Sequence, residues 1–230
     1  MIDFHTHVLP CVDDGSSDVK ESIALLKMLK EQGLDMVIAT PHFDPRGDTP
    51  KQFLDRRANA YSELTQHLCD KDLPKVFLGA EISYFYGISR VDRLVDLRIV
   101  GTKLLLIEMP MCQWSDAMVK ELIELATYSD FKPVLAHIER YLGFVPQRLI
   151  ERLADSGILM QINASFLSSR RTRGVAIRMI KRGYVHFLGS DCHNITSRPP
   201  KMSEAIDIIR SKLGNEFFDR AEFIFDKYSV

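Results

Sequence analysis

The sequence is poor in the features that mark several protein classes. Its four cysteines, Cys11, Cys69, Cys112 and Cys192, are scattered through 230 residues and form no Cys-x-x-Cys pair. This spacing argues against a disulfide framework and favours reduced thiols. No apolar run comes near the roughly 20 residues that cross a bilayer, and no basic segment precedes the first apolar run, as a signal peptide would require. We therefore expect a cytoplasmic protein without membrane insertion.

An excess of either charge is also lacking. The chain has 30 basic and 31 acidic residues and a net charge of −1, so it carries no basic footprint typical of nucleic-acid-binding proteins. The most basic stretch, "SSRRTRG" at 168–174, is the candidate for a local basic patch, and a solvated loop or helix start is the favoured explanation. With 46% hydrophobic and 27% charged residues, the composition indicates one sizeable globular core. We expect a single domain over residues 1–230 and no nucleic-acid partner.

Short apolar runs alternate with longer amphipathic stretches along the whole chain. Most of the apolar runs are nearly continuous, as is typical of strands that are covered on both faces. Seven β-then-α units in series indicate an α/β fold with a parallel sheet. Closing this sheet gives a TIM-like barrel of seven strands, and an open doubly wound sheet is the alternative. The predicted strands are residues 1–7, 35–42, 75–84, 104–110, 132–140, 157–164 and 184–193.

The predicted helices lie between these strands. The clearest one covers residues 16–33, where Ser16 or Ser17 can cap the first turn and Gly33 follows the end. The remaining helical patterns cover residues 51–70, 115–129, 146–156, 173–182 and 201–212, and the tail 216–228 is expected to form a last helix.

Two histidines one residue apart open the sequence, in "MIDFHTH". Residues i and i+2 of a strand point to the same face, so His5 and His7 can aim at one point. Two converging imidazoles suit a bound cation, and an ordinary strand with polar residues near its end is the alternative. Asp191 and His193 in "SDCH" repeat the spacing. Because one such pair does not complete the ligand set of an ion, a metal site requires further ligands elsewhere in the chain.

Ionisable residues stand at the ends of most predicted strands. The C-terminal strand ends of a β/α barrel ring one mouth, where active sites are built, and ionisable groups that end apolar strands are costly unless paired or coordinated. Taken singly, each has an ordinary explanation as a turn residue, a helix-start residue or a buried ion-pair partner. Their gathering on one rim favours a metal site. The candidate ligands are His5, His7, Asp14, His42, Glu81, Glu108, His137, Asp191 and His193.

This set is too large for one ion, which takes about four to six ligands. Mixed imidazole and carboxylate donors suit manganese, iron or zinc, and no thiolate is needed. We therefore expect a cluster of two or three ions about 3.5–4 Å apart. Such clusters generate hydroxide near neutral pH and clamp the oxygens of a phosphoryl displacement, so hydrolysis is the natural reaction class.

The ordered motifs match a known family. "DFHTH", "VDDG", "TPHF", "GAEI", "LIEMP", "AHIERY" and "GSDCHN" follow one another from residue 1 to about 200. In this set the chain resembles the PHP (polymerase and histidinol phosphatase) superfamily. More closely, it is similar to the bacterial manganese-dependent protein-tyrosine phosphatases encoded with capsule and exopolysaccharide genes. The resemblance implies a distorted (β/α)₇ barrel with a trinuclear site, and manganese as its metal.

The resemblance also implies roles for individual residues. By its position before the glycine of "VDDG", Asp14 is chosen as a ligand, and Asp13 stays the alternative. The arginines matching the family's phosphate-holding positions are Arg140 in "HIERY" and Arg198 in "NITSRPP", for which a surface ion pair is the ordinary explanation. The implied ligand groups are His5, His7, Glu81 and Asp191 for one ion, Glu81, Glu108 and His137 for a second, and Asp14, His42 and His193 for the third.

One residue departs from the family pattern. Cys192 lies inside the "SDxH" motif, where a small residue such as alanine is more usual. We interpret it as a tolerated small residue rather than a nucleophile, because no "CxxxxxR" phosphate loop surrounds any cysteine of the chain.

The function implied by the resemblance is attack of a metal-bound hydroxide on phosphotyrosine. The implied partner is the phosphotyrosine-rich C-terminal tail of a membrane-bound capsule-assembly tyrosine kinase. The alternatives are a small-molecule phosphomonoesterase of the histidinol-phosphate phosphatase type, a nuclease, or a non-catalytic metal-binding regulator of the kinase. Near-neutral charge weighs against the nuclease, and the intact ligand set weighs against the regulator. The sequence leaves the native metal, the general acid and the oligomeric state open.

Overall fold

The structure is a computed structural model that describes residues 1–68, 72–128 and 130–230. Cys69 and the predicted helix ends at 69–70 and 129 lie outside these residues. The strands pair in parallel in two ladders, in the orders β1-β2-β4 and β3-β5-β6-β7-β8-β9. Their bounds are β1 (Ile2–Thr6), β2 (Met36–Ala39), β3 (His42–Phe43), β4 (Lys75–Leu78), β5 (Glu81–Ser83), β6 (Leu104–Glu108), β7 (Lys132–Leu135), β8 (Leu159–Asn163) and β9 (Phe187–Gly189).

The two ladders join into one curled sheet, because β3 continues the course of β2 and β5 continues that of β4. Between them, the backbone amides of Gly79 and Glu81 donate to the carbonyls of Ala39 (2.8 Å) and Pro41 (3.0 Å). The predicted strands 35–42 and 75–84 are therefore each broken once. Pro41 has no N–H to donate to a ladder, and a side chain at Gly79 would meet Ile99 Cγ1 at 3.1 Å.

The first and last strands also meet, which closes the sheet into a distorted barrel. The amide of Asp191 donates to the carbonyl of His5 at 2.8 Å, and the amide of His7 donates to the carbonyl of Cys192 at 2.9 Å. Thr6 and Cys192 form a parallel bridge between these bonds. The predicted α/β barrel is confirmed, and the open doubly wound alternative is wrong.

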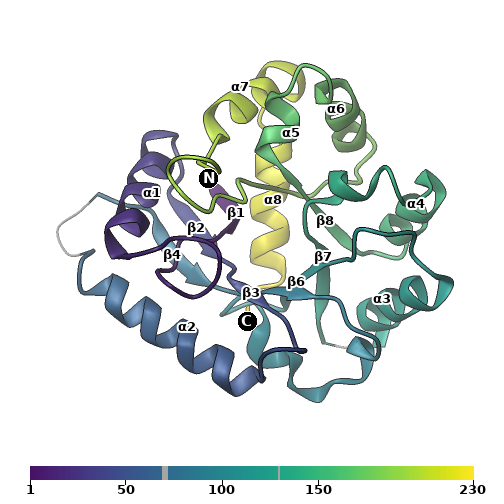
Figure 1. Cartoon of the computed structure of the whole chain (residues 1–230). Coiled ribbons are helices and arrows are strands. Elements are labelled where there is room, and N and C mark those ends of the chain that lie inside the picture. Colours follow the sequence, from purple (N-terminus) through teal and green to yellow (C-terminus); the bar gives the residue numbers. More distant parts are fainter. Residues whose placement is uncertain (69–71, 129) are drawn as a thin grey trace.

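Helices surround the ring of strands, and α8 lies across its centre in the view of Figure 1. Each predicted helix is present within the described residues, whereas the short α5 was not predicted. Within the same ranges every helix is too short or too polar to span a bilayer. The bounds are α1 (Val19–Glu31), α2 (Pro50–Thr65), α3 (Asp116–Tyr128), α4 (Gln147–Asp155), α5 (Ala164–Ser168), α6 (Arg173–Lys181), α7 (Met202–Leu213) and α8 (Glu216–Lys227).

The start of α1 differs from the prediction. Its N-cap is Asp18, whose carboxylate accepts the amide N–H of Glu21 at 2.9 Å. Ser17 donates its hydroxyl to the Glu21 carboxylate at 2.8 Å, and Ser16 donates its hydroxyl to the Asp18 carbonyl at 2.9 Å. Aspartate and serine cap helices about equally well, so the pattern alone did not separate them. Gly33 follows the helix end with a φ of 83°, as predicted.

The basic stretch at 168–174 is the turn that leads into α6, which agrees with the interpretation as a loop or helix start. Its last arginine faces inward. Arg173 donates to the carbonyls of Leu167 (3.1 Å) and Ser168 (2.8 Å) at the end of α5. This arginine is therefore engaged with the fold.

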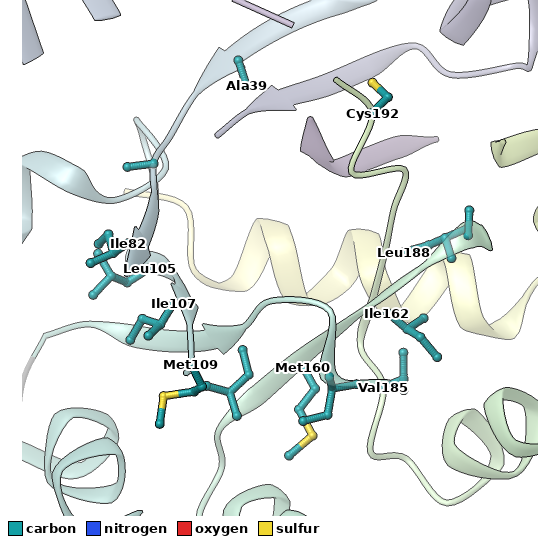
Figure 2. Close-up of a cluster of buried hydrophobic side chains, with 14 of the residues drawn as sticks. Ala39, Ile82, Leu105, Ile107, Met109, Met160, Ile162, Val185, Leu188 and Cys192 are labelled. Carbon is teal, nitrogen blue, oxygen red and sulfur yellow. The ribbon is translucent and has the colours of Figure 1, made fainter. Parts of the chain in front are cut away.

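The core has two layers, one inside the barrel and one outside it. Inside, Phe4 stacks on Phe187 with ring centroids 3.8 Å apart, and α8 places Phe225 against the same cluster. Outside, side chains from the strands pack under the surrounding helices, among them Ile107, Ile162 and others in Figure 2. Each fully buried apolar side chain of this size contributes about 1.5–3 kcal/mol. The two layers fix the strands whose ends build the site.

Candidate metal centre at the barrel mouth

Strand β1 brings two imidazoles together. Its register against β2 moves from Asp3 opposite Val37 to Thr6 opposite Ala39, so β1 carries one extra residue between these pairs. Such a bulge re-aims side chains, and here it lets Phe4 and the following His5 both face the barrel interior. The Nε2 atoms of His5 and His7 lie 3.1 Å apart, and both rings are fully buried.

Glu81, the first residue of β5, lies at the centre of the cluster. Its Oε2 is 3.1 Å from His5 Nε2, 3.4 Å from His7 Nε2 and 3.1 Å from His42 Nδ1. Its Oε1 is 2.9 Å from His137 Nε2. Glu108, at the end of β6, reaches the same His137 nitrogen at 3.5 Å. Both oxygens of the buried Glu81 carboxylate therefore face imidazole nitrogens.

The residues after β9 complete the cluster. Asp191 Oδ1 is 3.8 Å from His5 Nε2 and 3.6 Å from His7 Nε2. His193 Nε2 lies 3.3 Å from Asp14 Oδ1, whose distance to His42 Nε2 is 3.5 Å. The structure thus brings all nine sequence-predicted candidates to one end of the barrel.

Asp13 and Asp14 have different positions. Asp13 Oδ2 accepts from His7 Nδ1 at 2.7 Å and from the amide of His42 at 2.9 Å, so it holds the far side of the His7 ring. Asp14 is 65% exposed and faces His42 and His193. A Cβ at Gly15 would lie 2.4 Å from the carbonyl oxygen of His7, so only glycine allows the loop to fold this closely. The geometry supports Asp14 rather than Asp13 as the ligand.

Two of the candidate ligands have a left-handed backbone. His137 has a φ of 30° and Asp191 a φ of 53°; Cys11 is the third non-glycine residue with positive φ in the described ranges. Such conformations cost about 1–3 kcal/mol each and cluster at functional sites. They also explain why β7 and β9 end at Leu135 and Gly189, before the ends of the predicted strands 132–140 and 184–193.

Strand β8 contributes two residues that the sequence interpretation missed. Gln161 Oε1 accepts from the amide of His137 at 2.7 Å and lies 3.2 Å from His5 Nδ1. Asn163 donates its side-chain amide to Asp191 Oδ2 at 2.9 Å and accepts from Gln161 at 2.8 Å. These residues orient the candidate ligands. The signal was available, because they stand at i and i+2 in the otherwise apolar "GILMQINA".

Charges inside the cluster are balanced between carboxylates and imidazoles. Burial raises the pKa of Glu81, but the imidazoles of His5, His7 and His137 outweigh burial and hold this pKa well below its usual range. Burial lowers the pKa values of His7 and His137, yet their carboxylate partners raise them to about 10 and about 9. Cations that take these ring nitrogens must displace protons.

The residues present fit a bound cation at His193. Its Nε2 atom is buried, has no hydrogen-bond partner among the described residues, and lies near the Asp14 carboxylate. Burial and the neighbouring His7 and Arg198 lower the pKa of the ring to about 4. The lowered pKa favours the neutral ring, and because Nδ1 donates to the Asp191 carbonyl at 3.0 Å, Nε2 keeps a lone pair available to a metal.

Donor atoms that lie within 4.8 Å of one another form three sets. They overlap the three groups that the resemblance implies, although His42 rather than His137 joins Glu81 and Glu108 in the second set. The sets are His5, His7 and Glu81, then His42, Glu81 and Glu108, and finally His7, Asp14, His42 and His193.

Arg140 and Arg198 both reach the cluster. Arg198 Nη2 donates to Asp191 Oδ1 at 2.9 Å, and Arg140 Nη2 donates to the other oxygen of the same carboxylate. Both guanidinium groups are about one-third exposed at the mouth. Their ion pairs thus lie at the candidate centre and not on a remote part of the surface.

No thiol among the described cysteines belongs to the donor sets of the candidate centre. Cys192 is fully buried, and burial raises the pKa of its thiol. Cys11 and Cys112 are exposed and free, and Cys11 donates its Sγ hydrogen to the carbonyl of Ser17.

Together, the fold and the cluster define a parallel α/β barrel of the PHP type with a histidine- and carboxylate-lined site at its mouth.

Comparison with known proteins narrows this class. The chain matches the family "Capsular polysaccharide synthesis, CpsB/CapC" over residues 1–225 and belongs to it. It is 32% identical over 228 residues to tyrosine-protein phosphatase CpsB of Streptococcus pneumoniae, covering 93% of this chain and 91% of that protein. It is 28% identical over 222 residues to tyrosine-protein phosphatase YwqE of Bacillus subtilis, covering 94% and 86%.

Comparison with solved structures supports the same family assignment. A chain from the crystal structures of YwqE and CpsB, called unique metal-dependent tyrosine phosphatases, superposes with a TM-score of 0.84 at 26% identity, covering 100% of this chain and 96% of that one. Histidinol phosphate phosphatase from Lactococcus lactis has a TM-score of 0.59 at 13% identity, covering 92% and 93%, which shows the shared fold alone. The family resemblance found in the sequence motifs is confirmed.

Proposed function

We propose that this chain is a metal-dependent tyrosine-protein phosphatase of capsular polysaccharide synthesis and that its substrate is the phosphotyrosine-rich tail of a membrane-bound capsule-assembly tyrosine kinase. The single observation that carries the proposal is the convergence of nine imidazole and carboxylate side chains with two arginines at one mouth of the barrel. Family membership and the names of the relatives support the same activity. The phosphatase acts on the cytoplasmic side of the membrane.

The nine residues would hold two or three ions, with manganese proposed as the native metal and iron and zinc as the alternatives. The donor set contains imidazoles and carboxylates and no thiolate, which suits these metals. Glu81 presents one oxygen to His5, His7 and His42 and the other to His137, so both of its oxygens would be available to hold ions. When bound, such ions lower the pKa of a coordinated water and stabilise negative charge on a phosphoryl group.

Arg140 and Arg198 would bind the phosphate of the substrate. Both guanidinium groups now donate to Asp191, and both are open to the mouth. A planar guanidinium can offer two parallel N–H bonds to phosphate oxygens. Donors placed in advance around the transferred group stabilise the charge on its equatorial oxygens.

The leaving group suits a site in which the chain provides no thiol chemistry. A phenolate has a pKa of about 10, far below that of an alkoxide, so it departs more readily. Asp13 and Gln161 contact the Nδ1 atoms of His7 and His5, which aims the Nε2 atoms of both rings into the cluster, and Asn163 orients Asp191.

Release of phosphate from p-nitrophenyl phosphate tests the proposal, after chelation and separate re-addition of manganese, iron and zinc. We expect activity to disappear with the chelator and to return most fully with manganese. Turnover of a phosphotyrosine peptide, histidinol phosphate and single-stranded DNA then separates the alternatives. A wide preference for histidinol phosphate would contradict the proposal. Binding of the kinase tail without hydrolysis of any aryl phosphate would identify a non-catalytic regulator.

A further inference from the structure

A groove of about 480 Å³ lies beside the candidate centre. One wall follows β5 and includes Tyr84 and Tyr86, and the other follows β6 and includes Met109 and Met111. The segment 44–46, after β3, closes one side. Tyr86 is 76% exposed and Met111 is 45% exposed, so both present large apolar surfaces to solvent. An exposed apolar groove next to a catalytic centre is a candidate substrate-binding surface.

The groove and the metal centre share a boundary. Glu108 is a candidate ligand and also lines the groove. Its carbonyl accepts the amide of Tyr84 at 2.8 Å, and its backbone pairs with Ser83 in the β5–β6 ladder. A phosphotyrosine whose phosphate lies between Arg140 and Arg198 can therefore extend its chain past Glu108 into the groove.

Buried groups fix the β5 wall from behind. Glu121 of α3 is buried, and its carboxylate accepts the hydroxyl of Tyr84 at 2.6 Å and the amide of Gly87 at 2.8 Å. Gly87 has a φ of 88°, which a side chain would resist, and so it makes the turn just after Tyr86. These two bonds clamp the loop on both sides of Tyr86.

Buried groups fix the β6 wall as well. The amide of Met109 donates to the Tyr141 hydroxyl at 2.9 Å, and the indole of Trp114 donates to the Pro110 carbonyl at 3.1 Å. Met111 follows directly after these two anchored residues. Walls that are ordered before binding reduce the entropy lost when a ligand enters.

The lining of the groove offers no unpaired cation to an acidic ligand. Arg46, the cation in its lining, forms a two-pronged ion pair with Asp44 at 2.7–3.1 Å. Glu108, the other charged residue of the lining, is a candidate metal ligand and lies 3.5 Å from His137 Nε2, so its charge belongs to the candidate centre. Apart from Ser83, the remaining contacts are aromatic rings, methionines and prolines, which pack against apolar or aromatic side chains.

We propose that this groove binds the residues next to the phosphotyrosine of an extended peptide, and that it selects aromatic or aliphatic neighbours over acidic ones. The inference rests on the proposed phosphatase function and adds the class of sequence that the site accepts. Tyr86 and Met111 supply the selective contact, and Glu121 is a positioning residue that acts through Tyr84 and Gly87.

The test compares two phosphotyrosine hexapeptides that differ only in carrying phenylalanine or aspartate on both sides of the phosphotyrosine. Their kcat/KM ratio is measured on the manganese-loaded full chain, so that differences in active fraction cancel. For the wild type we expect a preference for the phenylalanine peptide of about tenfold or more, corresponding to about 1.4 kcal/mol. The double variant Tyr86→Ala, Met111→Ser should lower this ratio to about threefold or less.

Two further variants serve as controls. Tyr86→Phe keeps the ring and should keep the ratio. Phe223→Ala removes another exposed aromatic, 65% exposed on α8, and should change neither the ratio nor the hydrolysis of p-nitrophenyl phosphate. An unchanged ratio in the double variant, or a wild type that prefers the aspartate peptide, would overturn the inference. Failure of the wild type to hydrolyse p-nitrophenyl phosphate with any metal would instead overturn the proposed function.

Discussion

The two ends of the barrel interior are built from the same strands but by opposite means. At the end covered by α8, Phe4, Phe187 and Phe225 form a dry apolar cluster. At the mouth, a few residues further along these strands, His5 and Asp191 belong to a buried polar cluster. Phe4 and His5 are neighbours in the sequence, and the extra residue in β1 lets both point inward.

Along each strand, the residues that stabilise the fold therefore lie at one end and the candidate functional residues lie at the other. At the apolar end, burial of apolar side chains alone stabilises the fold, and small shifts in geometry are tolerated. The mouth buries carboxylates and imidazoles and places His137 and Asp191 in left-handed conformations, all of which cost stability. A barrel keeps such a site because the other end stabilises the strands that carry it.

The largest effect is expected from truncating a ligand at the mouth. His5→Ala or Asp191→Ala should abolish hydrolysis of p-nitrophenyl phosphate and reduce the manganese content measured by atomic absorption. His5 and Asp191 each lie within 4 Å of two or more other candidate donors, so either truncation removes a donor from the centre of the cluster.

Arg140→Ala is the matched comparison at the same mouth. It should leave the metal content intact and lower turnover by about 10²–10³-fold, the usual loss when one charge-stabilising donor is removed. Unchanged activity in all three variants would refute the candidate centre.

At the apolar end, truncating a side chain is expected to lower stability and to leave activity nearly unchanged. Phe225→Ala empties a buried position against the inner cluster and should lower the free energy of unfolding by about 3–5 kcal/mol. Urea denaturation followed by circular dichroism measures this loss, and activity per folded molecule should change little. Phe223→Ala, two residues away on the exposed face of α8, should stay within about 0.5 kcal/mol of the wild type. Equal losses in both variants would show that α8 does not seal the barrel.

The candidate ligands of the mouth and the residues that support them differ in how well they could be predicted from sequence. Ionisable residues that end apolar strands are conspicuous, so the nine candidate ligands from His5 to His193 could be predicted from the sequence alone. Gln161 and Asn163 were missed because amides inside a strand carry no charge and resemble ordinary polar positions. The break of the strand 35–42 at Pro41 was missed because it depends on how neighbouring ladders meet in space.

The missed amides provide a smaller test of the mouth. Gln161→Leu removes the oxygen beside His5 Nδ1 and the acceptor of the His137 amide while keeping a similar volume. Loss of such an orienting partner typically lowers metal affinity by 10–100-fold. Competition with a chelator measures the affinity for manganese. Leu159, an inward residue of the same strand β8, offers the control Leu159→Met, which should leave the affinity unchanged. Equal affinity in both variants would mean that the ligands hold their positions without help from β8.

The smallest effect concerns a histidine outside the mouth. His186, just before β9, accepts the amide N–H of Met160 through Nδ1 at 3.2 Å, and burial together with Arg220 and Lys132 lowers its pKa to about 4. The unfolded chain binds this proton near pH 6.5. The stability that depends on the neutral ring is therefore fully present above about pH 6.5 and is lost as the pH falls towards 4.

His186→Asn keeps an acceptor near the Met160 amide but cannot titrate. Between pH 6.5 and 4.5, the difference in unfolding free energy between wild type and variant should change by up to about 1.4 kcal/mol per pH unit, the slope of one proton. Urea denaturation of both proteins across this range measures the slope, and any contribution from the mouth cancels because the two share it. Parallel curves would show that His186 binds its proton equally well in the folded and the unfolded chain, and would contradict a lowered pKa in the folded state.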